Sequence, residues 1–330
     1  MNRPIVTSLI ALATAAASWQ LALTTVSARS GIAATQSETP QRTNDGHPDF
    51  HGYWTNDTFT PLERAPELAG KEFFTEAEAA AEFKKRQDRY LAQPKNDVHY
   101  DDAIWQNETY DKEPNRRTSL IFDPPNGRVP PLTVEGARRL AARVKAQETG
   151  PADGAEIRSL AERCISWGNV GPPMLPPTYN ANLQILQTSN SVIIVHEMIH
   201  DVRPIRLDRP AHLPSRIRLL AGDSIGRWEG ETLVVDTTNF TDKTNFRGPP
   251  RSTRQDIYAS DALHVVERFT PIDANRIKYQ FTVDDPTTWT SKWSGEIPLR
   301  RFEGPLFEYA CHEGNYGLPG ILRGARALEK

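Results

Sequence analysis

From residue 182 onward, the order of hydrophobic and polar positions predicts a succession of β-strands. Valine, isoleucine, threonine and aromatic residues dominate short runs, and turn-forming residues such as those at 273–275 separate the runs. Together with an early strand at 50–54, the predicted strands cover residues 183–188, 191–197, 202–207, 232–237, 263–270, 276–283, 289–299 and 306–311. Short connections between consecutive strands are typical of an antiparallel meander. The sequence therefore predicts a mainly β fold whose meander closes into a barrel or packs as a sandwich.

Two predicted helices interrupt the strand pattern in the N-terminal part of the chain. The first covers 75–90, where Thr75 and Glu78 have the spacing of a capping box and alanine-rich sequence follows. The second covers 133–148 and is opened by a threonine. Proline-rich segments without a regular pattern lie at 94–131 and 168–177. We therefore expect a helical and loop insertion at about 70–180.

The first 28 residues have the pattern of an export signal. Arg3 is their single charged residue, a run of mostly Ala, Leu, Ile and Thr follows, and Val26-Ser27-Ala28 supplies the small residues that signal peptidase requires. An uncleaved membrane anchor is the alternative interpretation. Residues 29–46 are small and polar, which is typical of a disordered leader. We expect one folded domain over 47–330, periplasmic or secreted, without stable membrane insertion after cleavage.

Charge and cysteine content narrow the classes of partner and scaffold. The 330 residues include 39 basic and 42 acidic side chains, and a net charge of −3 gives no electrostatic reason to expect a nucleic acid. Two cysteines are too few for a disulfide scaffold or a four-thiolate metal site. In an oxidising compartment, Cys164 and Cys311 are expected to form one disulfide, and a nucleophilic cysteine is the alternative.

The first predicted strand carries a motif of a known β-barrel family. Gly52-Tyr53-Trp54 resembles the Gly-x-Trp signature of lipocalin-type barrels, in which an arginine from a late strand packs on the tryptophan. Arg300 or Arg301 matches that arginine. The resemblance implies a lipocalin-like, or calycin-like, barrel. The segment 70–180 departs from the family, whose strands follow one another directly, and is expected to be a large insertion.

Three longer phrases resemble a large group of exported bacterial proteins that have no established activity. They are Gly46-His47-Pro48-Asp49-Phe50-His51-Gly52-Tyr53-Trp54, Gly226-Arg227-Trp228-Glu229-Gly230-Glu231-Thr232-Leu233-Val234-Val235 and Tyr309-Ala310-Cys311-His312-Glu313. This second resemblance implies export and a β-rich C-terminal half. It implies no catalytic role for any residue.

The sharpest chemical motif is His196-Glu197-Met198-Ile199-His200, the His-Glu-x-x-His signature of zinc peptidases. On a helix, His196 and His200 share one face and bind Zn²⁺, while Glu197 activates a water molecule. Spaced apolar residues from 192 to 202 are compatible with such a helix. A third metal ligand is missing from its familiar positions.

A strand is the alternative structure for the same residues. Four β-branched residues at 192–195 favour a strand, on which the two histidines lie about 13 Å apart, too far for one metal ion. His196, Met198 and His200 then share one face, and Glu197 and Asp201 lie on the other. If the first face lines a barrel interior, two imidazoles enter a cavity and are suited to proton transfer. An ordinary solvent-exposed polar face is the other interpretation.

A second cluster of polar residues surrounds the C-terminal cysteine. If Cys311 is bonded to Cys164, His312 lies on a fixed backbone, as a catalytic or ligand-binding imidazole requires. Glycines at 314 and 317 allow a turn that directs Asn315 and Tyr316 into a pocket mouth, with Glu313 as a polar partner. A polar turn at the end of a strand is the alternative. Trp289 and Trp293, spaced to share a strand face, line a cavity or fill the core.

Three functions are compatible with these clusters. The first is an exported enzyme that transforms a small apolar or amphipathic molecule by cofactor-independent acid–base chemistry, as a lyase, isomerase or hydrolase. The second is a zinc-dependent hydrolase, and the third is a non-catalytic carrier on the same barrel. The candidate catalytic residues are His196, Glu197, His200, Asp201, His312 and Tyr316. The candidate ligand-binding residues are Met198, Trp289, Trp293, Glu313 and Asn315.

Overall fold

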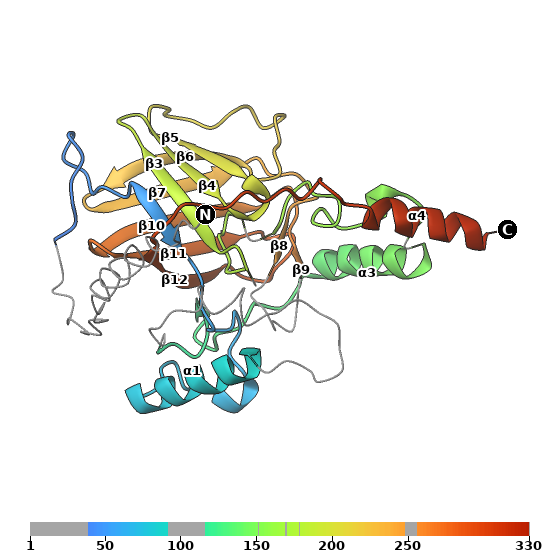
Figure 1. The fold of residues 1–330 in the computed structure, drawn as a ribbon, viewed down its shortest axis with the longest axis horizontal. Coiled ribbons are helices and arrows are strands. Elements are labelled where there is room, and N and C mark those ends of the chain that lie inside the picture. Colours follow the sequence, from blue (N-terminus) through green and yellow to red (C-terminus); the bar gives the residue numbers. More distant parts are fainter. Residues whose placement is uncertain are drawn as a thin grey trace, which may run out of the picture. The chain divides into compact units, whose positions relative to one another are not determined.

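The computed structural model in Figure 1 describes residues 39–91, 116–150, 152–168, 170–177, 179–247 and 256–329. These residues belong to one compact unit, Glu38–Lys330. The predicted export signal and the first part of the predicted leader lie outside the described residues. Where the leader is described, from residue 39 to 46, it differs from the expected disorder. Arg42 forms a β-bridge with Pro48 and an ion pair of 2.9 Å with Glu231, and these contacts hold the segment in a turn.

Nine strands form a closed β-barrel, as the hydrophobic pattern predicts (Figure 1). In the order in which they pair, they are β1 (Gly52–Thr55), β3 (Asn182–Gln187), β4 (Ser191–His196), β5 (Val202–Arg206), β6 (Asp223–Glu229), β7 (Thr232–Thr238), β10 (His264–Asp273), β11 (Arg276–Asp284) and β12 (Trp293–Arg301). The barrel closes because β1 pairs with both β3 and β12. The short strand β2 (Ile121–Asp123) adds to β12, and β8 (Asn245–Arg247) pairs with β9 (Asp256–Tyr258) in a separate ladder.

The barrel is mixed, which corrects the prediction of a purely antiparallel meander. Strands β5 and β6 run parallel, with Ile205 opposite Ser224. A parallel pair needs a long crossover connection, and residues 207–222 supply it. Residues 223–229, which form β6, were not among the predicted strands.

Side chains of the strands fill the barrel interior. Buried positions alternate along β4 and β11, as expected when one face of a strand points inward. Trp54, Tyr279 and Trp293 are among the largest fully buried side chains, each at most 1 % exposed. The arginine contact implied by the lipocalin resemblance is present, because the guanidinium carbon of Arg301 lies 4.1 Å from the ring centre of Trp54.

Three α-helices occur among the described residues: α1 (Glu76–Leu91), α3 (Val134–Thr149) and α4 (Gly317–Leu328). The first two confirm the predicted helices and their caps. The backbone amide of Thr75 donates to Glu78 (2.9 Å), and the amide of Gly136 donates to the hydroxyl of Thr133 (3.0 Å). Short 3-10 helices are η1 (Pro66–Leu68), η2 (Ala155–Ile157) and η3 (Met198–His200). None of the described helices is long and apolar enough to cross a membrane.

The chain after β12 differs from the predicted strand pattern. Residues 306–311, predicted as a last strand, form no strand, and α4 follows them. The outer edge of β12 is already paired with β1 and β2, so it offers no free edge to a further strand. The helix α4 was not predicted, and Pro319 and several glycines within it disfavour a helix locally. Proline is tolerated there, since the first four amides of a helix have no intrahelical acceptor.

The start of α3 is fixed to the turn between β11 and β12. The amide of Thr133 donates to the carbonyl of Thr288 (2.9 Å), and its hydroxyl donates to the carbonyl of Thr287 (2.6 Å). At Gly136 the helix approaches this turn so closely that a Cβ atom would lie 2.5 Å from the carbonyl oxygen of Thr288. Glycine, the weakest helix former in this segment, is therefore required by the close contact.

Candidate functional site

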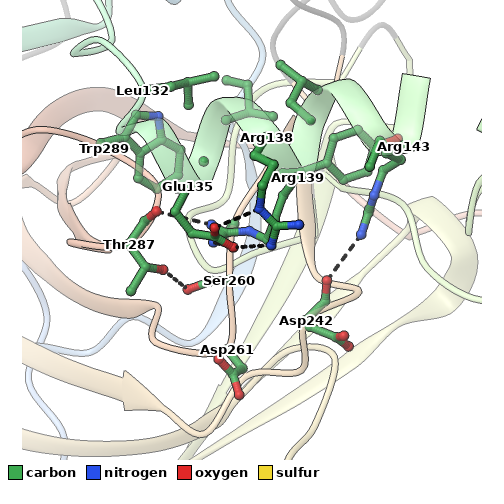
Figure 2. Close-up of a pocket in the computed structure, with 16 residues that line it drawn as sticks. Leu132, Glu135, Arg138, Arg139, Arg143, Asp242, Ser260, Asp261, Thr287 and Trp289 are labelled. Carbon is green, nitrogen blue, oxygen red and sulfur yellow. Dashed lines mark hydrogen bonds and ion pairs between the residues drawn. The ribbon is translucent and has the colours of Figure 1, made fainter. Parts of the chain in front are cut away.

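A cavity of about 630 Å³, named here the α3 cavity, lies between α3 and two segments of the barrel domain (Figure 2). The helix forms one wall, and the other wall comes from residues 257–261 and from the turn at 285–289. The lining residues are Leu132, Glu135, Gly136, Arg138, Arg139, Leu140, Ala142, Arg143, Asp242, Ile257, Tyr258, Ala259, Ser260, Asp261, Thr287 and Trp289. The volume falls within the usual range for small-molecule sites.

One end of the α3 cavity is apolar and aromatic. Trp289 stacks against Phe246 with ring centroids 6.3 Å apart and meets Trp293 edge-on at 5.8 Å. Both tryptophans were predicted to bind a ligand, and the structure places only Trp289 in the cavity wall. Trp293 lies behind it in the core and is 0 % exposed. The indole nitrogens of both are buried without a hydrogen-bond partner among the described residues.

Three arginines of α3 line the middle and the other end of the cavity (Figure 2). Arg139 donates to the hydroxyl of Thr288 (2.7 Å). Arg143 donates to the carbonyl of Asp242 (3.3 Å), and its guanidinium carbon lies 4.1 Å from the ring centre of Tyr258. A guanidinium carries five N–H donors, and these contacts use only part of them. The arginines are therefore held in place while keeping donors for a ligand.

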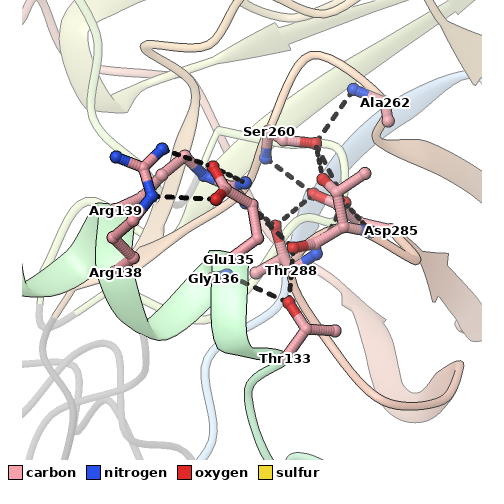
Figure 3. Close-up of polar contacts among 10 residues, drawn as sticks. Thr133, Glu135, Gly136, Arg138, Arg139, Ser260, Ala262, Asp285 and Thr288 are labelled. Carbon is pink, nitrogen blue, oxygen red and sulfur yellow. Dashed lines mark hydrogen bonds and ion pairs between the residues drawn. The ribbon is translucent and has the colours of Figure 1, made fainter.

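The turn that supports the cavity is organised by Asp285 (Figure 3). Its carboxylate accepts from the amide and hydroxyl of Ser260 (2.6 and 2.9 Å) and from the amide and hydroxyl of Thr288 (3.0 and 2.6 Å). Thr287 adds two further donors. Burial raises the pKa of Asp285, but these hydrogen bonds lower it more, so the carboxylate stays charged. The hydroxyls of Ser260 and Thr288 are thereby committed to structure.

The chemistry of this cavity is suited to binding. Its lining carries three arginines and three acidic residues, Glu135, Asp242 and Asp261, next to an apolar wall. The hydrogen bonds from Arg138 lower the pKa of Glu135, which therefore remains a carboxylate. Among the described lining residues there is no histidine or cysteine, the groups most often used for proton transfer or nucleophilic attack.

The first histidine of the zinc motif lies inside the barrel. His196 ends β4 and is 6 % exposed, in line with the buried positions Val192 and Ile194. Its Nε2 atom has no hydrogen-bond partner among the described residues. Burial and, secondarily, the charge of Arg203 lower the pKa of His196 to about 3. The imidazole is therefore neutral at pH 7.

A tight turn follows His196 instead of a helix. The predicted strand is confirmed over 191–196, while η3 and then β5 occupy the rest of the segment. The helix required by the zinc interpretation is not formed, because the β-branched run pairs with β3 and β5. The expected common face of His196, Met198 and His200 is also not formed, since the chain turns at Ile199 with a φ of 60°.

The other residues of the motif hold the turn against the C-terminal segment. The carboxylate of Glu197, which is 3 % exposed, accepts from Asn180 (2.6 Å) and from the amide of Phe307 (3.1 Å). His200 is exposed, and its Nδ1 atom lies 2.9 Å from the carbonyl of Tyr309. Asp201 accepts from the amide of Val202 (2.9 Å), and burial raises the pKa of its carboxyl group. Met198 and Ile199 pack with Val170 beside Trp167, Tyr309 and Cys311.

The predicted disulfide between Cys164 and Cys311 is present. It fixes the segment after Tyr309 beside η3. Asn315 donates to the carbonyl of Glu162 (3.3 Å), so it supports this arrangement instead of facing a pocket. His312, Glu313 and Tyr316 are exposed, Tyr316 to 83 %. The α3 cavity and two smaller cavities, one beside Trp54 and Arg301 and one beside Trp167 and Phe246, are not lined by His196, His200 or His312.

A buried ion pair crosses the barrel interior near His196. Arg203 pairs with Glu267 through both oxygens of the carboxylate, one of them at 2.9 Å. Tyr279 donates its hydroxyl proton to Glu267 (2.8 Å), and Arg203 also donates to Ser224 and Thr237 (3.1 and 3.2 Å). These residues were not predicted as a cluster, because each lies at an inward position of a different strand and has no local motif.

A chain of histidines and aspartates, formed by His212 of the 207–222 crossover and by residues of β6, β7 and β10, was also missed. His212 lies 3.1 Å from Asp223 through Nδ1 and 2.9 Å from Asp236 through Nε2. His264 approaches the other oxygen of Asp236 through Nε2 (3.0 Å), and this hydrogen bond raises the pKa of His264. These residues are far apart in sequence and meet only because β7 pairs with both β6 and β10.

The two histidines of the zinc motif do not converge on one point. A zinc ion needs its ligand atoms within about 2.0–2.3 Å of one point. His196 is enclosed by the barrel, whereas His200 is exposed and faces Tyr309, so the pair does not fit such a site. In the part of the chain that the structure describes, no three or more His, Cys, Asp or Glu side chains are arranged to hold a metal ion.

Comparison with known proteins adds no further assignment. No family model, no curated protein and no solved structure matches this chain.

Proposed function

We propose that the protein binds an amphipathic organic anion in the α3 cavity. The observation that carries the proposal is the presence, in one cavity, of three arginines and an apolar wall that includes Leu132, Ile257 and Trp289. Guanidinium groups hold carboxylate or sulfonate oxygens by charge-assisted hydrogen bonds. Aromatic and aliphatic carbons bury the apolar part of the same ligand. This is the carrier hypothesis, with the ligand outside the barrel instead of inside it.

The filled barrel interior supports this location. Lipid-type ligands of small barrels occupy an interior cavity, but here Trp54, Tyr279 and Trp293 are buried within it and the pair Arg203–Glu267 crosses it. A ligand inside would have to displace fully packed side chains. The α3 cavity is lined by α3, residues 257–261 and the turn at 285–289, so a ligand there does not displace the side chains packed inside the barrel.

The disulfide supports the proposal that the protein is exported. Disulfides persist in the periplasm and outside the cell and are rare in the cytosol. The bond between Cys164 and Cys311 joins the segment after α3 to the segment before α4. The cleavable signal at residues 1–28 remains a prediction from sequence.

Binding of 8-anilinonaphthalene-1-sulfonate, an aromatic sulfonate whose fluorescence rises in apolar sites, tests the proposed function. We expect saturable binding at one site, weakened about tenfold in Arg143→Gln because a charge-assisted hydrogen bond is lost. Arg227→Gln, which changes an exposed arginine of β6, is the matched control and is expected to bind as the wild type does. Equal affinity of Arg143→Gln and the wild type would contradict the proposal.

A second candidate function is acid–base catalysis on a small molecule. The observation that favours it is the pair Asp236–His264, in which a carboxylate orients an imidazole that is still 37 % exposed. Such a pair is the usual arrangement of a general base. The original candidates His200 and His312 lie at the surface near the disulfide and stay catalytic candidates for the same reaction class.

Hydrolysis of p-nitrophenyl acetate tests this second candidate. If His264 acts as a base, the rate rises with pH around a pKa above that of free histidine, because Asp236 stabilises the protonated ring. Asp236→Asn is expected to move that inflection to lower pH, and His264→Asn to remove it. A rate that is unchanged in both variants would exclude the pair from catalysis.

A further inference from the structure

Glu135 occupies the place where a ligand anion would meet the arginines of the α3 cavity. Its two carboxylate oxygens accept from Nη2 and Nε of Arg138 (2.8 and 2.9 Å), a two-point contact of the kind that guanidinium makes with ligand carboxylates. One oxygen also lies 3.3 Å from Nη1 of Arg139. Figure 3 shows the carboxylate of Glu135 among these side chains at the start of α3.

The charges of the cavity give this contact its significance. Arg138, Arg139 and Arg143 supply three positive charges, and Glu135, Asp242 and Asp261 supply three negative ones. The ligand-free lining therefore has no excess positive charge. An anion that enters while Glu135 stays in place meets a lining without net charge, so its electrostatic attraction is weak. If the anion replaces Glu135 on Arg138, it forms a two-point hydrogen-bonded contact with the guanidinium.

The surrounding contacts allow such a replacement. Arg138 is 69 % exposed and Glu135 is 47 % exposed, so both side chains have room to separate. Arg139 would stay in place, because Thr288 still accepts from it at 2.7 Å. The helix would also stay in place, because its start is held by the hydrogen bonds of Thr133 and not by Glu135.

We infer that Glu135 is an internal competitor that sets the ligand specificity of the α3 cavity: a carboxylate or sulfonate ligand binds by displacing Glu135 from Arg138. The inference rests on the proposed function. Two properties follow. The cavity favours ligands with a full negative charge, because only these can replace Glu135 on Arg138, and Glu135 keeps binding reversible by competing for the same guanidinium. An ordinary surface ion pair within a helix predicts none of these properties.

Two fluorescent probes that differ only by the presence of a sulfonate group test the inference. One is 8-anilinonaphthalene-1-sulfonate, and the other is N-phenyl-1-naphthylamine, which lacks the sulfonate. In Glu135→Gln we expect the affinity for the sulfonate to rise by about threefold to tenfold and the affinity for the uncharged amine to stay the same. Glu148→Gln changes a second exposed glutamate of α3 outside the cavity lining and is expected to alter neither affinity.

The outcomes separate this inference from the proposed function. If Arg143→Gln weakens sulfonate binding while Glu135→Gln leaves it unchanged, the cavity binds anions and the role of Glu135 is overturned. A change of equal size for both probes in Glu135→Gln also overturns it, because that result indicates an altered helix instead of released arginines. If Arg143→Gln has no effect on the sulfonate, the proposed function fails and the inference fails with it.

Discussion

Two arginine–glutamate pairs in this protein have the same chemistry and opposite surroundings. In the barrel interior, the side chains of Arg203 and Glu267 are 5 % and 0 % exposed, and Tyr279 donates to the same carboxylate. On α3, Arg138 and Glu135 are 69 % and 47 % exposed. The first pair is enclosed by strands on all sides, whereas the second pair borders a cavity.

The difference shows how burial decides what an ion pair can do. Two charges taken out of water are costly, so each buried partner is retained by the other and by further hydrogen bonds. An exposed pair contributes little to stability because water and salt compete with it. Only the exposed pair can exchange one partner for a ligand. The predictions below test this contrast, from the largest expected effect to the smallest.

Removing one charge of the interior pair has the largest expected effect. Glu267→Gln leaves Arg203 buried without a counter-charge, and we expect the free energy of unfolding to fall by about 3–5 kcal/mol. Urea denaturation of the disulfide-bonded protein measures it. Glu135→Gln is the matched control and is expected to cost no more than about 1 kcal/mol. Equal losses in the two variants would mean that burial does not distinguish the pairs.

Removing Asp285, which organises the turn that supports the α3 cavity, is expected to have the next largest effect on the free energy of unfolding. Asp285→Ala removes the acceptor of the buried amides of Ser260 and Thr288, and we expect a loss of about 2–3 kcal/mol in unfolding free energy. Because the same turn seats α3, binding of the fluorescent sulfonate should weaken too. A variant as stable as the wild type would show that water replaces this carboxylate without cost.

A third case to compare with the two ion pairs is Asp57, a buried acid without an ion-pair partner among the described residues, and the pH dependence of stability reports on it. Asp57 is 3 % exposed, and burial raises its pKa from 3.8 to about 8, although Arg300 opposes the shift. The folded state therefore holds a proton that the unfolded state releases. The stability from this group is complete below pH 3.8 and is lost as the pH rises toward 8, by up to about 1.4 kcal/mol per pH unit.

The stability contributed by His196 changes with pH in the opposite direction to that contributed by Asp57. This difference defines the best pH window for the measurement. Its pKa is about 3 in the fold and 6.5 as the ordinary value, so its contribution is lost as the pH falls from 6.5 toward 3. Above pH 6.5 the contribution of His196 to stability no longer changes with pH, so it does not offset the change caused by Asp57. In Asp57→Asn, the decrease in stability between pH 6.5 and 8 should be smaller than in the wild type. Parallel curves in urea denaturation would contradict the raised pKa of Asp57.

The smallest expected effect concerns the cap of α3. Thr133→Ala removes the acceptor for the amide of Gly136 and the donor to the carbonyl of Thr287, and we expect a loss of about 1 kcal/mol. Thr133→Ser keeps both hydrogen bonds and is the control. Thermal unfolding of the two variants measures the difference, and identical midpoints would show that the cap does not hold the helix.

The features that were predicted correctly are those decided by neighbours in sequence. Alternation of apolar residues located most strands, and the caps at Thr75 and Thr133 located two helices. The disulfide could be predicted because only two cysteines are present. By contrast, α4 was missed because its glycines and Pro319 disfavour a helix locally, and β6 was missed because it lacks a clear apolar run.

The candidate site shows the limit of sequence reasoning. The motif from His196 to His200 has the residues of a metal site, yet its strand and turn divide them between the barrel interior and the surface. Trp289 was proposed as ligand-binding and does line the α3 cavity. The arginines opposite it were not proposed, since surface arginines on a helix have no local pattern that distinguishes a cavity wall from a solvated face.

The sequence by itself determined the β-rich class, two helix starts and the pairing of the cysteines. Strand periodicity and helix capping depend on residues that are neighbours in sequence, and two cysteines allow only one pairing. Only the tertiary structure decided that the barrel is mixed, that Arg203 meets Glu267 and that α3 encloses a cavity with Trp289. These features join residues from distant parts of the chain. Their energies depend on burial and on the approach of side chains, which exist only after the strands have paired.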